Sequence, residues 1–184
     1  ELRTPSLDLL PGFVDALHRG WSRDNVGLEK TIADDLLRIA EDAPAFVASL
    51  DDVAAAGGPI TLPDGTQFAR LPGYNRWLWD GEFCGSIGFR WQPGTSDLPP
   101  QVLGHIGYSV PEWKRGQGYA TRALALILPD ARARGLTHVD LTTDTGNIPS
   151  QRVITANGGV LVERFATPAA YDHAGDKLRF RITL

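Results

Sequence analysis

A cationic, glycine-rich segment stands directly in front of an apolar run in WKRGQGYATRALALIL, residues 113–128. Lys114 and Arg115 supply positive charge, and Gly116 and Gly118 leave the backbone open to a ligand because they carry no Cβ. If a helix begins here, its first N–H groups form the positive end of its dipole, which favours an anion. These groups would come from Gln117, Gly118, Tyr119 and Ala120, and Thr121 adds a hydroxyl. The segment therefore predicts an anion site, with an ordinary tight turn as the alternative.

Two common nucleotide-binding patterns do not fit this segment. A P-loop requires GxxxxGK[ST], which does not occur in the sequence. A dinucleotide fingerprint requires GxGxxG straight after a strand, but Thr121 stands at the third glycine position, and PEWKR separates the expected strand from the first glycine. Both nucleotide-binding patterns are therefore disfavoured for this segment.

Histidine and cysteine form no metal or disulfide pattern. His18, His138 and His173 lack metal-ligand spacing, so we expect no metal. Cys84 is the single cysteine, which excludes an intrachain disulfide and fits a reducing compartment. We interpret Cys84 as a small apolar strand residue rather than an acyl carrier.

Composition and charge narrow the class of protein. The sequence has 184 residues, a formal net charge of −4 and 42% hydrophobic residues, which is typical of one soluble globular domain. The negative charge argues against a general nucleic-acid binder, since such proteins need a basic face. No apolar stretch is long enough to span a membrane, and Pro5 and Pro11 interrupt the start before a signal-peptide core forms. We therefore expect a cytoplasmic protein that binds neither nucleic acid nor membrane.

Apolar periodicity predicts the secondary structure. Spacings of three and four indicate helices within residues 7–50, divided near Pro44, and glycines and prolines mark 54–66 as a loop. From residue 67 the period is two, and Asp80-Gly81 joins two strands as a type I′ hairpin would. The later elements are strands over 102–110, 137–144, 160–166 and 177–184, and helices over about 116–135 and 148–159. This order predicts an α+β, or mixed α/β, fold with one central sheet.

The segment VPEWKRGQGYAT resembles the acetyl-CoA-binding motif of the GNAT superfamily of N-acetyltransferases. The family pattern is an Arg or Gln followed by x-x-G-x-G/A, which Arg115, Gly118 and Ala120 match. The preceding GHIGYSV and the following NIPSQRVITANGG resemble the adjoining family segments in the same order. The resemblance covers residues 67–184 well and the N-terminal helices loosely. It implies a single GNAT-like domain over 1–184 with a mostly antiparallel, splayed sheet, in which 1–66 shapes the acceptor side and 67–184 binds acetyl-CoA.

The resemblance also implies where acetyl-CoA binds. The pyrophosphate would lie on the turn amides from Gly116 to Thr121, and the pantetheine arm would pair with the preceding strand as an added strand does. A backbone N–H near Val110 would stabilise the tetrahedral oxyanion. Asn147 would bond a pantetheine amide and Ser150 would lie near the sulfur, with helix capping as the alternative. The implied cofactor-binding residues are Tyr108, Ser109, Val110, Arg115, Gly116, Gln117, Gly118, Tyr119, Ala120, Thr121 and Asn147.

Two positions depart from the family pattern. Many members carry a Tyr on the short helix as general acid for the departing thiolate, but the matching residue here is Ile154. Ser150 or a water would serve instead, or the thiolate would leave unassisted. Pro129 lies inside the helix that the motif opens and is expected to kink or interrupt it, downstream of the phosphate end.

The implied reaction is direct attack of a neutral amine on the thioester, so a group must accept the amine's proton. The candidate catalytic residues are Ser150, Asp144, His105 and Glu82, with Glu112 as a further base. His105 has a suitable intrinsic pKa but is also typical of a hydrogen-bonded core residue, and Asp144 could instead fix its turn. We interpret the aromatic residues Tyr74, Trp77, Trp79 and Trp91 as sheet packing, with Trp77 or Trp79 lining an amine pocket as the alternative.

These inferences predict an enzyme that transfers the acetyl group of acetyl-CoA to a primary amine of a small molecule or protein, without a metal. A noncatalytic acyl-CoA-binding or regulatory module is one alternative. An acyltransferase with a longer acyl donor or a hydroxyl acceptor is another. The sequence does not identify the acceptor, and the N-terminal helices either shape its pocket or form a homodimer contact.

Overall fold

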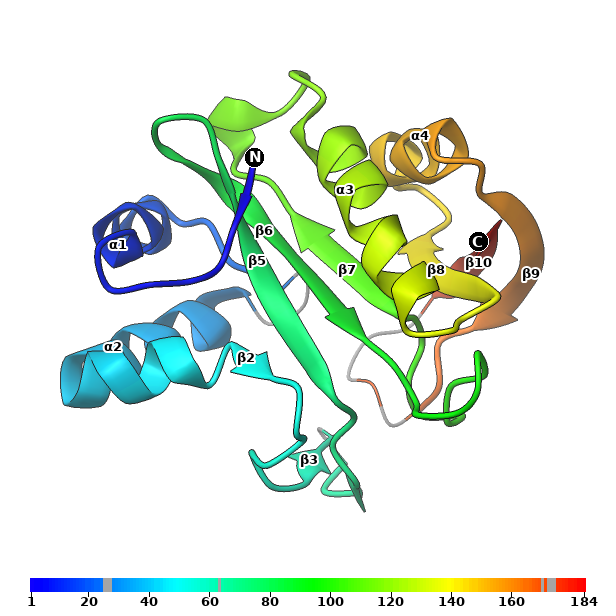
Figure 1. Ribbon diagram of the computed structural model, residues 1–184, viewed down its shortest axis with the longest axis horizontal. Coiled ribbons are helices and arrows are strands. Elements are labelled where there is room, and N and C mark those ends of the chain that lie inside the picture. The colour runs from blue at the N-terminus through cyan, green and yellow to red at the C-terminus, as the bar shows by residue number, and fades with distance from the viewer. Residues whose placement is uncertain (25–27, 63, 170, 172–174) are drawn as a thin grey trace.

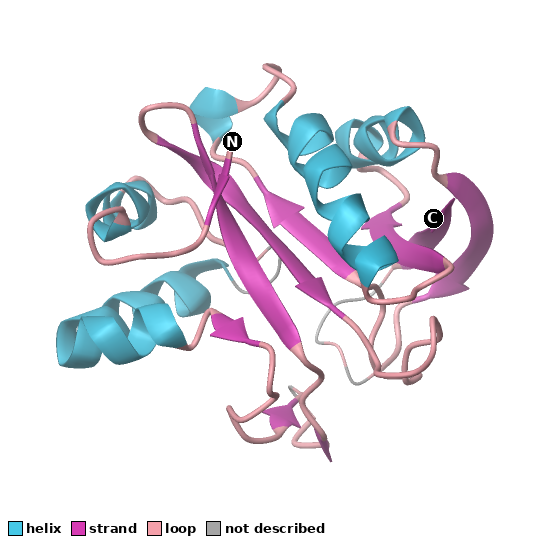
Figure 2. Ribbon diagram, viewed as in Figure 1, coloured by secondary structure: helices cyan, strands magenta, loops and turns pink. Residues whose placement is uncertain are grey.

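The computed structural model describes residues 1–24, 28–62, 64–169, 171 and 175–184 (Figures 1 and 2). Residues 25–27 of the expected helical stretch and His173 lie outside the described residues. The helices are α1 (Leu10–His18), α2 (Leu28–Ala48), α3 (Tyr119–Ala133) and α4 (Ile148–Ala156), with a short 3-10 helix over Glu112–Lys114. The strands are β1 (Leu2–Arg3), β2 (Asp51–Asp52), β3 (Ile60–Thr61), β4 (Gln67–Phe68), β5 (Gly73–Trp79), β6 (Phe83–Arg90), β7 (Ile106–Ser109), β8 (His138–Asp144), β9 (Val160–Ala166) and β10 (Asp176–Thr183).

The long strands form a splayed antiparallel arrangement. One sheet has the order β1-β5-β6-β7, with β2 also paired to β5, and a second has the order β8-β10-β9. The paired strands within both sheets are antiparallel. The neighbouring edges of the two sheets are β7 and β8, which lie beside α3 in Figure 1. The predicted α+β fold with a splayed sheet is therefore confirmed.

Strand alternation gives the first sheet two apolar faces, and helices cover both. On one face, Ile87 and Phe89 pack against Leu124 and Ile127 of α3 in a continuous core. On the other face, Trp77 packs against α1 and α2, in a cluster with Phe13, Leu17 and Phe46. Trp77 is 0% exposed, and its ring stacks on Phe13 with centroids 5.0 Å apart. Trp77 therefore packs in the core, as the packing interpretation expected.

The N-terminal helices follow the predicted periodicity. The second stretch is divided as expected, because Asp42 has non-helical φ and ψ within α2, just before Pro44. The Asp42 carboxylate accepts a hydrogen bond from the Ala45 N–H at 2.9 Å and so caps the segment that follows. The region expected to be a loop contains β3, which pairs with β4 just beyond that region.

The β5–β6 connection is not the predicted type I′ turn. That turn needs positive φ at both central residues, but Ala55 is the single described non-glycine residue with positive φ. Instead Trp79 pairs with Phe83 across a longer loop, after a register shift between Leu78 and Trp79. The added residue allows the Asp80 side chain to contact Cys84 and Tyr119.

Helix α3 is not interrupted at Pro129, where the sequence predicted a kink or an interruption. It runs as one helix from Tyr119 to Ala133. Proline removes one backbone donor, and the buried packing of Leu124, Ile127 and Ala131 on the same helix offsets that loss. The helix therefore keeps its N-terminal end fixed over the sheet.

Candidate active site

The segment between β7 and α3 forms an open turn. Gly116 has φ 75° and Gly118 has φ 79°, in the left-handed region that favours glycine. A Cβ built on either residue would meet no atom within 4 Å. The backbone therefore requires glycine at both positions, while the space beside them is open to a ligand.

The backbone N–H groups of residues 116–121 donate no hydrogen bond within the described chain. Arg115 N–H donates to Glu112 O at 3.2 Å, and the next donor is Arg122 N–H, to Gly118 O at 3.0 Å. No side chain caps α3. The positive end of this helix therefore presents a row of free donors, which is the arrangement that binds phosphate groups.

The tip of the β5–β6 hairpin lies against this turn. Lys114 Nζ lies 2.5 Å from Glu82 Oε1 and 3.7 Å from Asp80 Oδ1, so its charge is already paired. The Tyr119 hydroxyl donates to Asp80, and hydrogen bonds from Cys84 and Tyr119 lower the pKa of Asp80 to about 2. Burial raises the pKa of Cys84 to about 11, so its thiol stays protonated, as expected of a strand residue rather than an acyl carrier.

Strands β7 and β8 separate from one shared point. His105 N–H donates to Asp140 O at 2.7 Å, and Asp140 N–H donates to His105 Nδ1 at 2.9 Å. Beyond this pair the two strands belong to different sheets, so their ends at Ser109 and Asp144 stand on either side of an opening. The edge of β7 that faces this opening is free to pair with an extended ligand.

A hydrogen bond spans the opening between β7 and α4. Tyr108 Oη lies 2.9 Å from Ser150 Oγ and 3.2 Å from the Ser150 carbonyl oxygen. Burial raises the pKa of Tyr108 to about 12, so this hydroxyl keeps its proton at neutral pH. Ile154, one turn further along α4, is 1% exposed and belongs to the core. Tyr108 therefore supplies a phenolic hydroxyl beside a helix whose own Ile154 has none.

Asn147 and Asp144 flank the open end with their side chains already bonded. Asn147 Oδ1 accepts from Ser150 N–H at 3.1 Å, which is the capping role that the sequence left open. Asp144 Oδ1 accepts from Lys177 Nζ at 2.7 Å, and the Asp144 side chain is 64% exposed.

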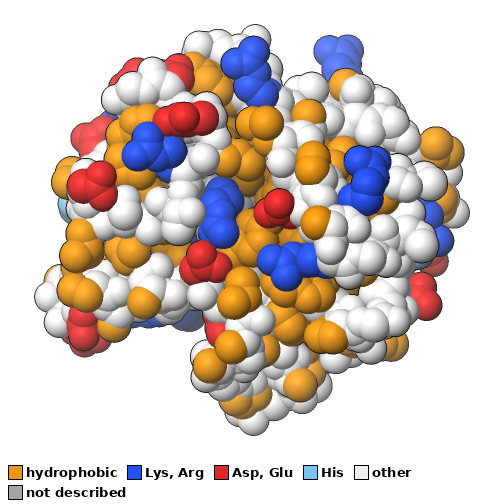
Figure 3. Space-filling view, in the orientation of Figure 1, with side chains coloured by type: hydrophobic (Ala, Val, Ile, Leu, Met, Phe, Trp, Pro, Cys, Tyr) orange, Lys and Arg blue, Asp and Glu red, His pale blue; other side chains and the backbone are white. Residues whose placement is uncertain are grey.

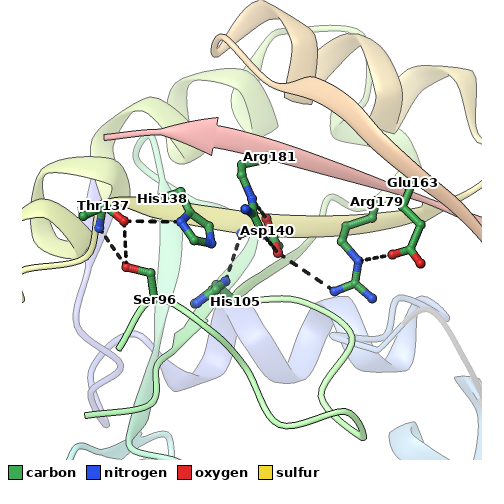
Figure 4. A network of polar contacts seen from close by, with 8 residues as sticks. All are labelled: Ser96, His105, Thr137, His138, Asp140, Glu163, Arg179 and Arg181. Atoms are coloured by element: carbon green, nitrogen blue, oxygen red, sulfur yellow. Dashed lines mark hydrogen bonds and ion pairs between the residues drawn. The ribbon is translucent and has the colours of Figure 1, made fainter. Parts of the chain in front are cut away.

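The closed end of the two strands holds a buried polar network (Figure 4). His105 is 0% exposed, and burial lowers its pKa to about 4. Asp140 accepts two hydrogen bonds from Arg181, at 2.8 and 2.9 Å. At about 3.3 Å per residue, His105 lies roughly 13 Å along the strand from Ser109. His105 therefore joins the two sheets far from the open end.

A cleft of about 390 Å³ lies on the face of the first sheet that also contacts α1 and α2. The cleft is lined by Arg23 and Asp24 of the α1–α2 loop, by residues of β2, β3 and β4, by the beginning of β5, and by parts of β6 and β7. Ser109 Oγ donates to the Ser22 carbonyl oxygen at 2.8 Å. This bond fixes the loop that carries Arg23 and Asp24 over the end of β7.

Comparisons with known proteins identify the family. A family model of the acetyltransferase (GNAT) domain matches residues 36–160, which is more than half of the chain. The chain belongs to the GNAT acetyltransferase family. No match was found among curated proteins.

Solved structures of GNAT acetyltransferases share this fold. RimJ of Mycobacterium smegmatis, in complex with a CoA-disulfide, is 19% identical with a TM-score of 0.64 over 99% of this chain and 85% of that one. RimL, a ribosomal alpha-N-protein acetyltransferase in complex with CoA, is 14% identical with a TM-score of 0.60 over 100% and 93%. MccE, the microcin C7 self-immunity acetyltransferase in complex with acetyl-CoA and AMP, is 10% identical with a TM-score of 0.59 over 100% and 91%. At these identities the likeness establishes the fold.

Within this GNAT domain, the structure brings some of the expected site residues together and separates others. The turn over residues 116–121, the free edge of β7, Tyr108 and Ser150 surround the same opening. Glu82 lies at the hairpin tip beside the turn, and His105 lies at the closed end.

Sequence reasoning missed the cleft and the side chains that line it. Strand alternation could have found part of it, because Ser86, Gly88 and Arg90 share one face of β6. Nothing in the sequence indicated that the loop with Asp24 lies over this face, since that contact is made between Ser109 and Ser22, far apart in the chain.

The described residues contain no group of three or more His, Cys, Asp or Glu side chains that could hold a metal ion. Among the described helices, none has the length and apolarity needed to span a membrane. Figure 3 shows basic and acidic side chains interspersed with apolar ones on the face that carries α3.

Proposed function

We propose that this protein transfers the acetyl group of acetyl-CoA to a primary amine within a ternary complex. The observation that carries the proposal is the uncapped turn at residues 116–121, whose free amides adjoin the opening between β7 and β8. A diphosphate on these amides directs an extended arm along the free edge of β7, where Tyr108, Ser109 and Val110 offer main-chain hydrogen bonds. The complexes of RimJ, RimL and MccE with CoA or acetyl-CoA support this donor.

The chemistry requires no covalent enzyme intermediate. The amine nitrogen bonds to the acetyl carbon, the carbon–sulfur bond breaks, and the sulfur leaves as the CoA thiolate. Tyr108 is suited to assist this departure, because its protonated hydroxyl lies at the opening beside Ser150. In this proposal Tyr108 donates a hydrogen bond to the sulfur, the role that a tyrosine at the position of Ile154 has in many family members.

The cleft on the opposite face of β7 is the proposed acceptor site. Gly107 and Tyr108 line it, so an amine in the cleft reaches the strand along which the acetyl arm lies. Asp24 lines the cleft and has no ion-pair partner among the described residues. We propose that the proton of the amine passes to Asp24, directly or through water, whereas Asp144 is held by Lys177.

Turnover tests the proposal directly. The purified protein is incubated with acetyl-CoA and a panel of amines that includes small alkylamines, amino acids and short peptides with free N-termini. We expect release of the CoA thiol with at least one amine, together with a mass increase of the amine that corresponds to one acetyl group. If acetyl-CoA binds and no amine is acetylated, the noncatalytic binding module is the better description.

A further inference from the structure

Paired strands form the floor of the acceptor cleft. Gly88 pairs with Asn75 on one side and with Gly107 on the other, and Gly73 pairs with Arg90. These residues share the sheet face that lines the cleft. The space above Gly107 is open, whereas the Asn75 side chain lies over Gly88, with its amide oxygen 2.9 Å from the position of a built Cβ. A ligand can therefore approach the strand backbone at Gly107.

One hydroxyl lies in this cleft. Ser86 lines the cleft, and its hydroxyl forms no hydrogen bond among the described residues. It lies at the level of Ser109, its register partner on β7, and is available to a ligand in the cleft.

The charged side chains of the cleft differ in how they are paired. Arg23 binds Asp35 through Nε at 2.7 Å and a second nitrogen at 3.2 Å, and Asp35 is 0% exposed. Arg70 donates to the Gly58 carbonyl oxygen at 2.9 Å and lies 3.7 Å from Asp52.

Arg90 is different from these two arginines. It lines the same cleft and has neither an ion pair nor a hydrogen bond from its side chain among the described residues. An unpaired guanidinium in a cleft is a binding group for a carboxylate or phosphate, because it can donate two parallel hydrogen bonds. Among the described residues that line the cleft, Arg90 is thus the cation without an ion pair, although the charge of Asp24 acts on it.

The spacing of these groups along β6 defines the acceptor. Ser86 marks the end of the cleft near the acetyl arm, and Arg90 lies roughly 13 Å further along the strand at about 3.3 Å per residue. An acceptor that places its amine at Ser86 and its anionic group at Arg90 must have several bonds between the two groups.

On this basis, and resting on the proposed function, we propose that the acceptor is an amine that carries an anionic group, bound by Arg90, with its chain extended along the cleft. An amino acid with a side-chain or α-carboxylate and a peptide with an acidic residue near its N-terminus share this chemistry. Arg90 acts here as a specificity-determining residue, and the amine nitrogen reacts at the other end of the cleft.

Matched acceptors test this inference. Peptides with a free N-terminal serine and either Glu or Gln at the second or third position are compared as substrates, and amino acids are compared with their amides. We expect kcat/KM to be about tenfold or more higher for the anionic member of each pair, since a hydrogen bond between charged groups is among the strong ones. If the preference for the anionic member is seen with peptides alone or with amino acids alone, that result identifies which of the two classes is the acceptor.

The variant Arg90→Gln should remove this preference. We expect KM for the anionic acceptor to rise about tenfold while KM for the neutral acceptor and the affinity for acetyl-CoA stay unchanged. Arg132→Gln is the matched control, because Arg132 is exposed on α3 and does not line the cleft. The inference is overturned if neutral acceptors are acetylated as fast as anionic ones or faster, and if Arg90→Gln changes neither rate. The proposed function would then still stand. Failure of every amine in the wild-type protein contradicts the proposed function instead.

Discussion

At the scale of single residues, the site depends on Tyr108. The sequence resemblance gave it a main-chain role in binding the pantetheine arm, and the structure adds a side-chain contact with Ser150 across the opening. Ile154 occupies the position at which many GNAT proteins carry a tyrosine. The Tyr108 hydroxyl, which comes from β7, provides a hydrogen-bond donor of the same kind, and a position-by-position sequence alignment cannot reveal this.

The variant Tyr108→Phe tests the residue-scale account. We expect kcat to fall about 10- to 100-fold, because the departing thiolate loses a hydrogen-bond donor, while the dissociation constant for acetyl-CoA changes little. A fall in affinity with kcat unchanged would show instead that Tyr108 acts in binding.

The pH profile gives a second readout of Tyr108. Its pKa is about 12, so the hydroxyl stays protonated throughout the range in which an alkylamine loses its proton. We therefore expect kcat/KM to rise with pH and to show no falling limb below about pH 11, within the range where the fold is stable. A falling limb near pH 8 that disappears in Tyr108→Phe would contradict this assignment.

At the scale of elements, the turn before α3 was the most predictable part of the site. Its glycines and its helix start follow from local sequence, and the observed positive φ values at Gly116 and Gly118 agree with the expected open turn. The β5–β6 loop was less predictable, because Asp80 takes its conformation from contacts with Cys84 and Tyr119. The length of β7 and the course of α3 through Pro129 likewise depend on packing partners that lie far away in the sequence.

Gly118→Asp tests the turn as an element, with Gly135→Asp as its control. Both glycines have φ 79° with no atom within 4 Å of a built Cβ, so both substitutions cause similar backbone strain. Asp at 118 adds a negative charge beside the proposed diphosphate, and Asp at 135 lies beyond the other end of α3. We expect the affinity for CoA, measured by calorimetry, to fall about a hundredfold in Gly118→Asp and to stay unchanged in Gly135→Asp. Equal losses in both variants would assign the effect to strain.

At the scale of the whole molecule, the buried contact between His105 and Asp140 joins the two sheets. The fold class and the splayed sheet were predictable from element order and family resemblance, and the helical N-terminal part from its periodicity. The cleft was not predictable, because it forms between the α1–α2 loop, the β3–β4 ribbon and the sheet, which meet only in the folded chain. The same is true of His105, whose strand pattern is compatible with either a base or a core residue.

Stability against pH tests the role of His105 at the joint. Its pKa is about 4 in the folded protein and 6.5 ordinarily, so below pH 6.5 the unfolded chain binds a proton that the folded chain does not. The free energy of unfolding should therefore decrease as the pH falls from about 6.5 to 4, by at most roughly 3 kcal/mol from this group. Urea denaturation at several pH values should show a shallower decrease in His105→Asn and an unchanged one in His18→Asn, since His18 is exposed. Identical slopes in all three proteins would contradict this role.

The central claim is that acetyl-CoA binds on the turn at residues 116–121 and along β7, and titration of isotope-labelled protein with acetyl-CoA, followed by amide NMR shifts, tests it most directly. The account predicts saturable binding with the largest shifts at the amides of Gly116 to Thr121 and at Tyr108 to Val110. Binding that leaves these amides unchanged, or an absence of binding by the folded protein, would contradict it.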